Sequence, residues 1–323
     1  MTFPDQLLAI MAEIAPMNRV FVSNDYSDAL SKLQTVLDFR IHEFPADDVV
    51  NHWVIPPSWN LIEAKIIKDG ETIYDACDNI LKVISLSLPF QGVVSLDELK
   101  KHLFYDHRTR RAIPFHFRQL YRPWERDWGF SVTEDFYDSL QSGHYEVSIK
   151  TNEFSAPLKI ADYILPGKSN RMIAIVAHLD HPGQANDDLS GVMVGIRIMQ
   201  LLKQRERIFS YRLVLVQEII GSVYYLNALK STGEILDIVS SVFLEMLGTN
   251  TQIGLQLSYK STSPIDLALS NFLNEERIPH TLAKFREIIG NDESVWEAHG
   301  ISLERGCVVR CGNSQHHSCD ELG

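Results

Sequence analysis

The spacing of apolar residues divides the chain into three regions. In the first forty residues, apolar side chains recur at helical spacing, as at Leu7, Met11 and Ile14, and this predicts two helices separated by the SNDYSD segment. Between about residues 40 and 150, short β-like runs (HWVIP, EAKIIKDG and LKVISLSLP) alternate with turn signals. This pattern predicts a small β-rich unit.

From about Tyr145 onward, apolar runs alternate with helical periodicity. The runs RMIAIVAH, YRLVLVQEII and IVSSVFLEMLG are continuously apolar, as expected for strands buried on both faces, and ISLERGCVV predicts a later strand. Helical segments, of which GSVYYLNALKS and PIDLALSNFLNEE are two, follow them. Strands that alternate with helices of this length predict an α/β domain with a largely parallel sheet covered on both faces.

Polar side chains stand where these predicted strands end. In open α/β sheets, ligands bind at the carboxyl ends of the strands, so these side chains should meet at one edge of the sheet. Imidazole and carboxylate groups together are the ligands of zinc, or less commonly of cobalt or manganese. The residues concerned are His178, Asp180, Asp187, Asp188, Glu218, Glu245, His316 and His317.

The net charge and the apolar content of the chain exclude some classes of binding partner. The formal net charge of −12 argues against a nucleic-acid partner, because phosphate binding needs a basic surface. The first residues lack a basic region typical of a signal peptide, and no apolar run is long enough to span a bilayer. We therefore expect a cytoplasmic protein with no membrane partner. The cysteines Cys77, Cys307, Cys311 and Cys319 read as reduced thiols, with a structural zinc site as the weaker alternative.

Several of these motifs together resemble a known superfamily. AHLDH…NDDLSG, QEIIGS, LEMLG and QHHSCDE, in this order, are similar to the co-catalytic zinc exopeptidases related to aminopeptidase Y. Three further stretches, WVIPPSWNLIEAKIIKDG, AIPFHFRQLYRPWERDWGF and GNDESVWEAHGI, resemble a bacterial family of little-characterised aminopeptidase-like proteins with a small inserted domain. The resemblance implies a three-layer α/β/α sheet, mixed and largely parallel, with a small β-rich insert. For this chain we expect N-terminal helices of the catalytic domain at 1–40, the insert at 41–135 and the rest of the catalytic domain at 136–323.

The resemblance also implies roles for individual residues. His178 would bind one zinc ion with Asp180 orienting its imidazole, and Asp187 would bridge two ions. Glu245 would complete the first site, and Glu218 with His316 the second. His316 is favoured over His317 because Asp320 follows it by four residues, as in the family, although Glu321 follows His317 at the same spacing. His181 is expected in the pocket wall, and Asp188 in the shaping of the loop.

One departure leaves the proton acceptor open. The family has two consecutive glutamates where this chain has Gln217 and Glu218, and an amide cannot serve as the general base. Either Glu218 is a ligand and the base lies elsewhere, or Glu218 is the base and the second metal is weak or missing. Glu293 is a candidate for a substitute base or for a receptor of a substrate amine.

The function expected from these observations is zinc-dependent hydrolysis of a peptide or small amide, with one or two Zn²⁺ ions. Two alternatives stay open. One is a non-catalytic or regulatory ligand-binding module without a base. The other is a mono-zinc amidase or cyclase of the glutaminyl cyclase type, with zinc on Asp187, Glu218 and His316. The basic and aromatic stretch HLFYDHRTRRAIPFHFRQLYRPWERDW is expected to pack the insert on the catalytic domain and to roof the pocket. The sequence leaves open whether the protein forms a homo-oligomer.

Overall fold

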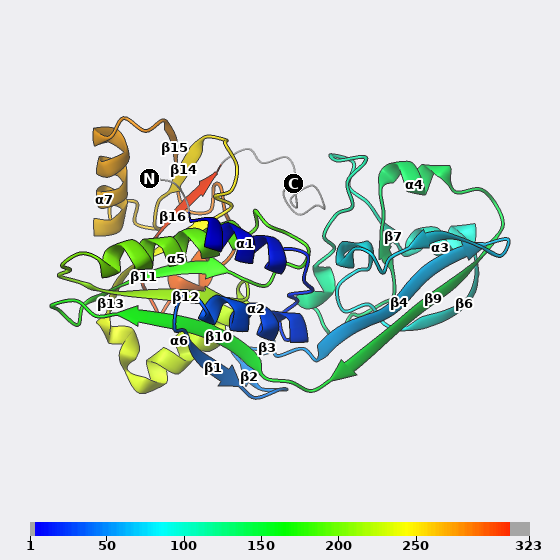
Figure 1. Cartoon of the computed structure of the whole chain (residues 1–323), viewed down its shortest axis with the longest axis horizontal. Coiled ribbons are helices and arrows are strands. Elements are labelled where there is room, and N and C mark those ends of the chain that lie inside the picture. The colour runs from blue at the N-terminus through cyan, green and yellow to red at the C-terminus, as the bar shows by residue number, and fades with distance from the viewer. Residues whose placement is uncertain (1–3, 311–323) are drawn as a thin grey trace.

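A computed structural model of the chain describes residues 4–310, and Figure 1 shows a larger and a smaller body joined side by side. The larger body contains an eight-stranded sheet in the order β1–β10–β12–β11–β13–β16–β14–β15. Strands β12, β11, β13 and β16 pair in parallel, while β10 and β14 pair antiparallel with β12 and β16. The strands are β1 (Arg40–Phe44), β10 (Leu158–Leu165), β11 (Met172–His178), β12 (Ser210–Val216), β13 (Ile238–Glu245), β14 (Ile253–Gln256), β15 (His280–Ala283) and β16 (Arg305–Arg310).

Helices cover both faces of this sheet, which confirms the predicted three-layer α/β/α fold. Along β11, Ala174 and Val176 pack into one apolar cluster with α6, while Ile175 and Ala177 pack into a second cluster with α1, α2 and α5. The alternation follows from the two-residue period of a strand. The helices are α1 (Asp5–Ile14), α2 (Asn24–Gln34), α5 (Leu189–Lys203), α6 (Ile220–Thr232), α7 (Pro264–Glu275) and the short α8 (Glu293–Trp296).

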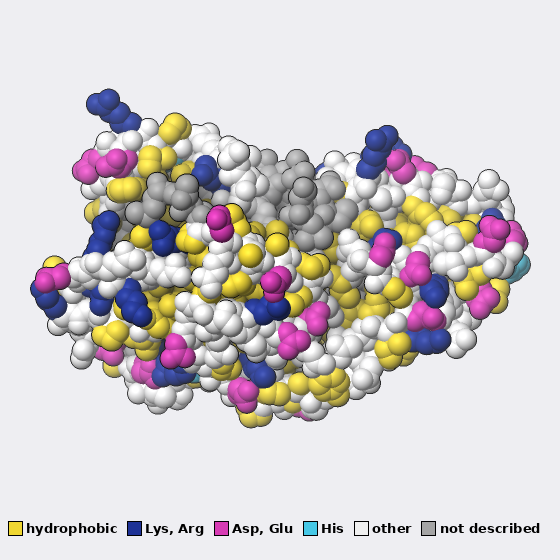
Figure 2. All heavy atoms as spheres, in the orientation of Figure 1, with side chains coloured by type: hydrophobic (Ala, Val, Ile, Leu, Met, Phe, Trp, Pro, Cys, Tyr) yellow, Lys and Arg dark blue, Asp and Glu magenta, His cyan; other side chains and the backbone are white. Residues whose placement is uncertain are grey.

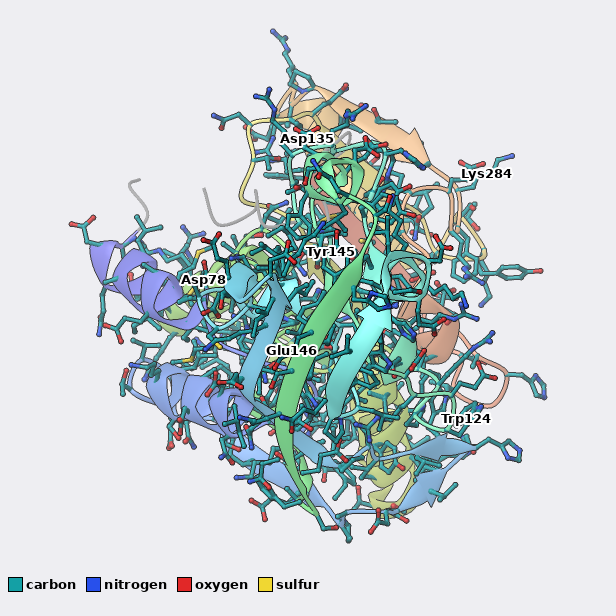
Figure 3. All side chains as sticks on the ribbon, turned by 90° about the vertical axis from the view of Figure 1, so that its right-hand side faces the viewer. Asp78, Trp124, Asp135, Tyr145, Glu146 and Lys284 are labelled. Carbon is teal, nitrogen blue, oxygen red and sulfur yellow. The ribbon has the colours of Figure 1, made fainter. Side chains whose placement is uncertain are left out.

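The smaller body is built on a four-stranded sheet in the order β5–β4–β9–β6, with antiparallel neighbours. On β9, Tyr145 is buried and Glu146 is exposed, and Figure 3 shows these neighbours along the strand. The elements of this body and its margins are β2 (Val49–Val50), β3 (Trp53–Val54), β4 (Ser58–Lys68), β5 (Glu71–Asp75), β6 (Phe90–Ser95), α3 (Leu96–Lys101), β7 (Leu103–Phe104), β8 (Phe130–Ser131), α4 (Glu134–Ser139) and β9 (His144–Phe154).

Two strands lie across the boundaries expected for the insert. Strand β1 falls within 41–135 except for its first residue, yet it pairs with β10 in the large sheet. Strand β9 follows residue 135 but pairs with β4 and β6 in the small sheet. The division of the chain into domains stays a prediction, with these pairings as the structural features that bear on it.

The β-like run LKVISLSLP was wrongly predicted as extended strand. Its first residues belong to a 3-10 turn, η1 (Ile80–Lys82), and the following residues lie outside the named strands. Leu81, Val83 and Leu86 are nevertheless buried, in the same apolar cluster as Ala174 and Val176 of β11. An apolar run marks burial, and here tertiary packing buries an irregular segment.

Charged side chains of both signs lie on the visible surface (Figure 2). On the face shown in Figure 2, acidic and basic side chains of the described residues are intermingled. Among residues 4–310, no helix combines the length and apolar character needed to cross a bilayer.

Candidate metal centre

The carboxyl ends of three neighbouring strands bring the predicted residues together. His178 is the last residue of β11, Glu245 is the last residue of β13, and Glu218 follows the end of β12. Asp187, Glu218 and Glu245 line one cavity of about 180 Å³. The remaining lining residues are Met246, Ile288, Ile289, Gly290 and Asn291. His316, His317, Asp320 and Glu321 lie outside the described residues.

Asp188 holds the loop after β11 against the sheet. Its Oδ1 accepts hydrogen bonds from the backbone N–H of Gly191 (3.1 Å) and Met246 (2.9 Å), and its Oδ2 accepts one from His178 N–H (3.2 Å). Asp188 therefore caps α5 and joins it to β11 and β13. Gly191 permits this approach, because a Cβ there would lie 2.5 Å from the carbonyl oxygen of Leu244.

His178 has a carboxylate partner that the sequence did not indicate. Its Nε2 lies 2.5 Å from Oδ2 of Asp292, which also accepts the Ile219 N–H at 2.9 Å. The second carboxylate oxygen of Asp292 accepts a hydrogen bond from the Ser222 hydroxyl. Asp180, predicted to orient His178, instead accepts the Glu218 backbone N–H at 2.9 Å. Asp292 belongs to the GNDESVW motif, in which the sequence pattern indicates only Glu293 as a candidate.

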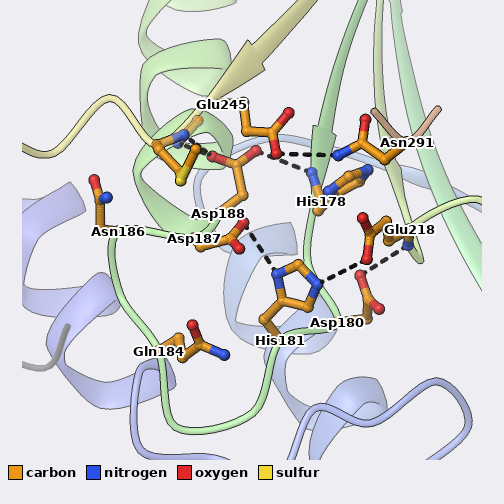
Figure 4. A network of polar contacts seen from close by, with 12 residues as sticks. His178, Asp180, His181, Gln184, Asn186, Asp187, Asp188, Glu218, Glu245 and Asn291 are labelled. Atoms are coloured by element: carbon orange, nitrogen blue, oxygen red, sulfur yellow. Dashed lines mark hydrogen bonds and ion pairs between the residues drawn. The ribbon is translucent and has the colours of Figure 1, made fainter. Parts of the chain in front are cut away.

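His181 lies between two carboxylates (Figure 4). Its Nδ1 is 3.0 Å from Oδ1 of Asp187, and its Nε2 is 3.3 Å from Oε2 of Glu218. His178, His181 and Asp187 each offer a ligand atom, and these atoms all lie within 4.8 Å of one another. The structure therefore groups His181, expected in the pocket wall, with two of the predicted metal ligands.

Two residues of the basic and aromatic stretch contact this site from the smaller body, while its role as a roof over the pocket stays a prediction. The Tyr121 hydroxyl donates a hydrogen bond to Oε2 of Glu218 at 2.5 Å. The ring of Phe115 packs edge-on to His181 with the ring centroids 5.6 Å apart. Trp124 of the same stretch is exposed and projects from the smaller body (Figure 3).

The side chains of Gln217 and of the candidate base Glu293 make their contacts outside the cavity. Gln217 donates from Nε2 to the carbonyl oxygens of Phe21 (2.9 Å) and Lys159 (3.0 Å). Glu293 accepts the Asn291 N–H at 2.9 Å, and its other oxygen lies 3.3 Å from Nε of Arg286. Neither side chain lines the cavity that Glu218 lines.

The charges around the cavity fit a bound cation. Burial, followed by the neighbouring carboxylates, raises the pKa of Glu245 well above its ordinary value, and burial likewise raises the pKa of Asp188. Burial acts to raise the pKa of Glu218 too, but contact with His181 and the hydrogen bond from Tyr121 lower it to about 2. Buried acidic residues in and next to this site include Asp180, Asp187, Asp188, Glu245, Asp292 and Glu293, and buried cationic candidates there include Arg19, His178, His181 and Arg305.

Unused polar atoms point to the same conclusion. Three buried polar atoms have no hydrogen-bond partner among the described residues: Nδ1 of His178, Oδ2 of Asp180 and Oε2 of Glu245. Buried polar atoms are nearly always paired, so such atoms in one place indicate a missing partner. Imidazole nitrogens and carboxylate oxygens are the donors that zinc takes in proteins, and the residues therefore fit a zinc ion.

Comparison with known proteins supports this interpretation of the fold. A Clostridium acetobutylicum protein named "Putative polysaccharide biosynthesis protein with aminopeptidase-like domain" is 27% identical over 98% of this chain and 72% of its own length. A crystal structure of a "putative peptidase" from the same species is 25% identical, with a TM-score of 0.89 over 98% of this chain and 74% of that chain. The zinc aminopeptidase BSAP from Bacillus subtilis has a TM-score of 0.68 at 12% identity, over 99% of this chain and 90% of that one.

These likenesses show an aminopeptidase-like fold, as the sequence resemblance implies. The model of one family matches residues 8–323, which is nearly the whole chain. The chain therefore belongs to the family described as "Domain of unknown function (DUF4910)".

Proposed function

We propose that this protein is a zinc-dependent hydrolase that cleaves an amide or peptide bond next to a free amino group, as an aminopeptidase does. The observation that carries the proposal is the group formed by His178, His181 and Asp187 beside the carboxylate-lined cavity. It lies at the carboxyl ends of the parallel strands, where ligands of open α/β sheets bind. The zinc aminopeptidase of similar fold from Bacillus subtilis favours the same reaction class.

The residues around the cavity have complementary roles in this reaction. Zinc, when bound, supplies a Lewis acid that polarises a carbonyl group and makes water a nucleophile near neutral pH. The Glu218 carboxylate lines the cavity, so its oxygens are placed to accept a proton from water and to pass it to the leaving amine. Ile288, Ile289 and Met246 form the apolar part of the cavity wall and would take the substrate side chain.

Carboxylates in the cavity favour a substrate with a protonated amine. Glu245 lies at the wall with Oε1 accepting a hydrogen bond from Asn291 Nδ2 at 3.0 Å. An ammonium group donates charge-assisted hydrogen bonds to such oxygens. A cavity of about 180 Å³ has room for one small or medium side chain near the scissile bond. These features support an aminoacyl amide or a peptide amino terminus as the substrate.

Metal content and amine release together test the proposal. The purified protein is stripped with a chelator, reloaded with zinc, and assayed for release of amine from a panel of aminoacyl amides. We expect bound zinc, zinc-dependent turnover, and loss of turnover in His178→Ala and Asp187→Ala, but not in the exposed control Asp135→Ala. Protein that takes up no zinc and releases no amine after zinc addition would contradict the proposal.

A further inference from the structure

We propose that His181 is a protein ligand of the zinc ion, together with His178 and Asp187, and that Glu218 stands beside the ion without binding it. This assignment rests on the proposed function in taking zinc as the metal. It departs from the ligand set implied by the family resemblance, in which Glu218 binds zinc and His181 does not. Its basis is the hydrogen-bond pattern of the two imidazoles.

The two histidines are held in the same way. Nε2 of His178 lies 2.5 Å from a carboxylate oxygen of Asp292, and Nε2 of His181 lies 3.3 Å from a carboxylate oxygen of Glu218. A histidine that binds a metal commonly donates its other ring N–H to a carboxylate, which fixes the tautomer and the ring orientation. In both rings this arrangement leaves Nδ1 as the nitrogen that binds a metal.

The positions of the two Nδ1 atoms fit this role. Nδ1 of His178 is buried with no hydrogen-bond partner in the described part of the chain. Nδ1 of His181 lies 3.0 Å from Oδ1 of Asp187. Two ligands of a tetrahedral zinc ion, each about 2.0–2.1 Å from it, lie about 3.3 Å apart, so this spacing is close to that of neighbouring ligand atoms. Two histidines and one carboxylate would leave one zinc position for water or substrate, as in catalytic zinc sites.

Glu218 has contacts that suit an outer position. One oxygen, Oε2, accepts the hydrogen bond from the Tyr121 hydroxyl and contacts Nε2 of His181. Its backbone N–H is held by Asp180. An oxygen that already has two donors is poorly placed to bind a cation, whereas the carboxylate still lines the cavity. This assignment favours Glu218 as the proton acceptor among the two alternatives that the sequence left open.

Zinc affinity of matched variants distinguishes the two ligand sets. We expect His181→Gln to lower zinc affinity by more than about 100-fold, because losing an outer partner already costs about 10–100-fold. Glu218→Gln keeps an oxygen for the His181 ring N–H and should stay within about tenfold of the wild type while losing turnover. His280→Gln, whose histidine contacts the carbonyl oxygen of Ile278, serves as the control with unchanged affinity. Loss of affinity in Glu218→Gln with retention in His181→Gln would overturn the assignment.

A measurement on the unmodified protein covers the case in which a variant fails to fold. Nitrogen NMR of protein labelled at the histidine rings reports which ring nitrogen binds an added zinc ion. We expect the Nδ1 signals of His178 and His181 to move together on addition of zinc, and an unmoved His181 would overturn the assignment. Zinc bound through His181 without amide cleavage would refute the proposed function alone. Zinc-dependent cleavage retained in a folded His181→Gln would refute the ligand assignment alone.

Discussion

Replacing Arg19 by methionine should destabilise the protein strongly, because its buried guanidinium fastens the metal-site loop to the N-terminal helices. It donates hydrogen bonds to the carbonyl oxygens of Leu179 (2.8 Å), Ile14 (2.6 Å), Ala15 (3.0 Å) and Gln184 (2.7 Å), and to that of His181. At about 1 kcal/mol for each carbonyl left without a partner, the lower end of the usual range, the loss is about 5 kcal/mol. Removing a buried charge offsets part of this loss, since burial lowers the pKa of Arg19 to about 9.

We therefore expect Arg19→Met to lower the free energy of unfolding by about 3–5 kcal/mol. The assay is denaturant unfolding in the presence of a chelator, so that metal binding does not contribute, with the midpoint and slope compared to the wild type. Arg205→Met is the matched control, because Arg205 is exposed, and should change the stability by less than about 0.5 kcal/mol. A stability of Arg19→Met within about 1 kcal/mol of the wild type would refute the idea that this side chain fastens the loop.

Three further predictions concern the packing of α5, acid stability and the contact between the two bodies. Gly191→Ala should lower the free energy of unfolding, because the added Cβ overpacks against the end of β13 at a cost of about 1–3 kcal/mol. The gain in helix propensity, about 1 kcal/mol, is smaller, so a denaturation midpoint above that of the wild type would contradict this prediction. Burial acts to raise the pKa of Asp162, but its contacts with the His42 imidazole, the Arg40 guanidinium and the Tyr225 hydroxyl lower it below its ordinary value. The ionised Asp162 should therefore stabilise the protein above about pH 4 and less so as the pH falls. The difference in free energy of unfolding between the wild type and Asp162→Asn should shrink from pH 6 to pH 3, and a difference that stays constant would contradict this prediction. Tyr121→Phe removes the hydroxyl that donates a hydrogen bond to Glu218, the candidate proton acceptor, and should lower kcat by about 10–100-fold with KM changed less than about threefold. The control Tyr224→Phe removes a hydroxyl that is hydrogen-bonded to the backbone near β2 and β3, and should leave kcat unchanged.

The large sheet could be predicted from the sequence because its signals are local. Continuous apolar runs such as that ending at His178 identify buried strands, and the polar residues after them identify the edge where a site forms. Asp187, Glu218 and Glu245 line the same cavity for this reason. The run LKVISLSLP shows that an apolar run alone does not define a strand, because its apolar residues are buried without forming one.

Contacts between distant segments could not be predicted in the same way. Asp292 lies 114 residues from His178, and Tyr121 lies 97 residues from Glu218. No periodicity connects such pairs, since they meet only after the loop before α8 and the smaller body have packed against the strand ends. His181 was expected in the pocket wall because the family's ligand spacing passes over it. Its two carboxylate neighbours become visible only in three dimensions.

The most direct test of the account is a crystal structure of the zinc-loaded protein with anomalous scattering measured at the zinc edge. We predict an anomalous peak in contact with His178, His181 and Asp187, next to the cavity lined by Glu218 and Glu245. Zinc bound only elsewhere on the molecule, or no peak at this site in protein that otherwise folds as described, would contradict the assignment of a metal centre to these strand ends.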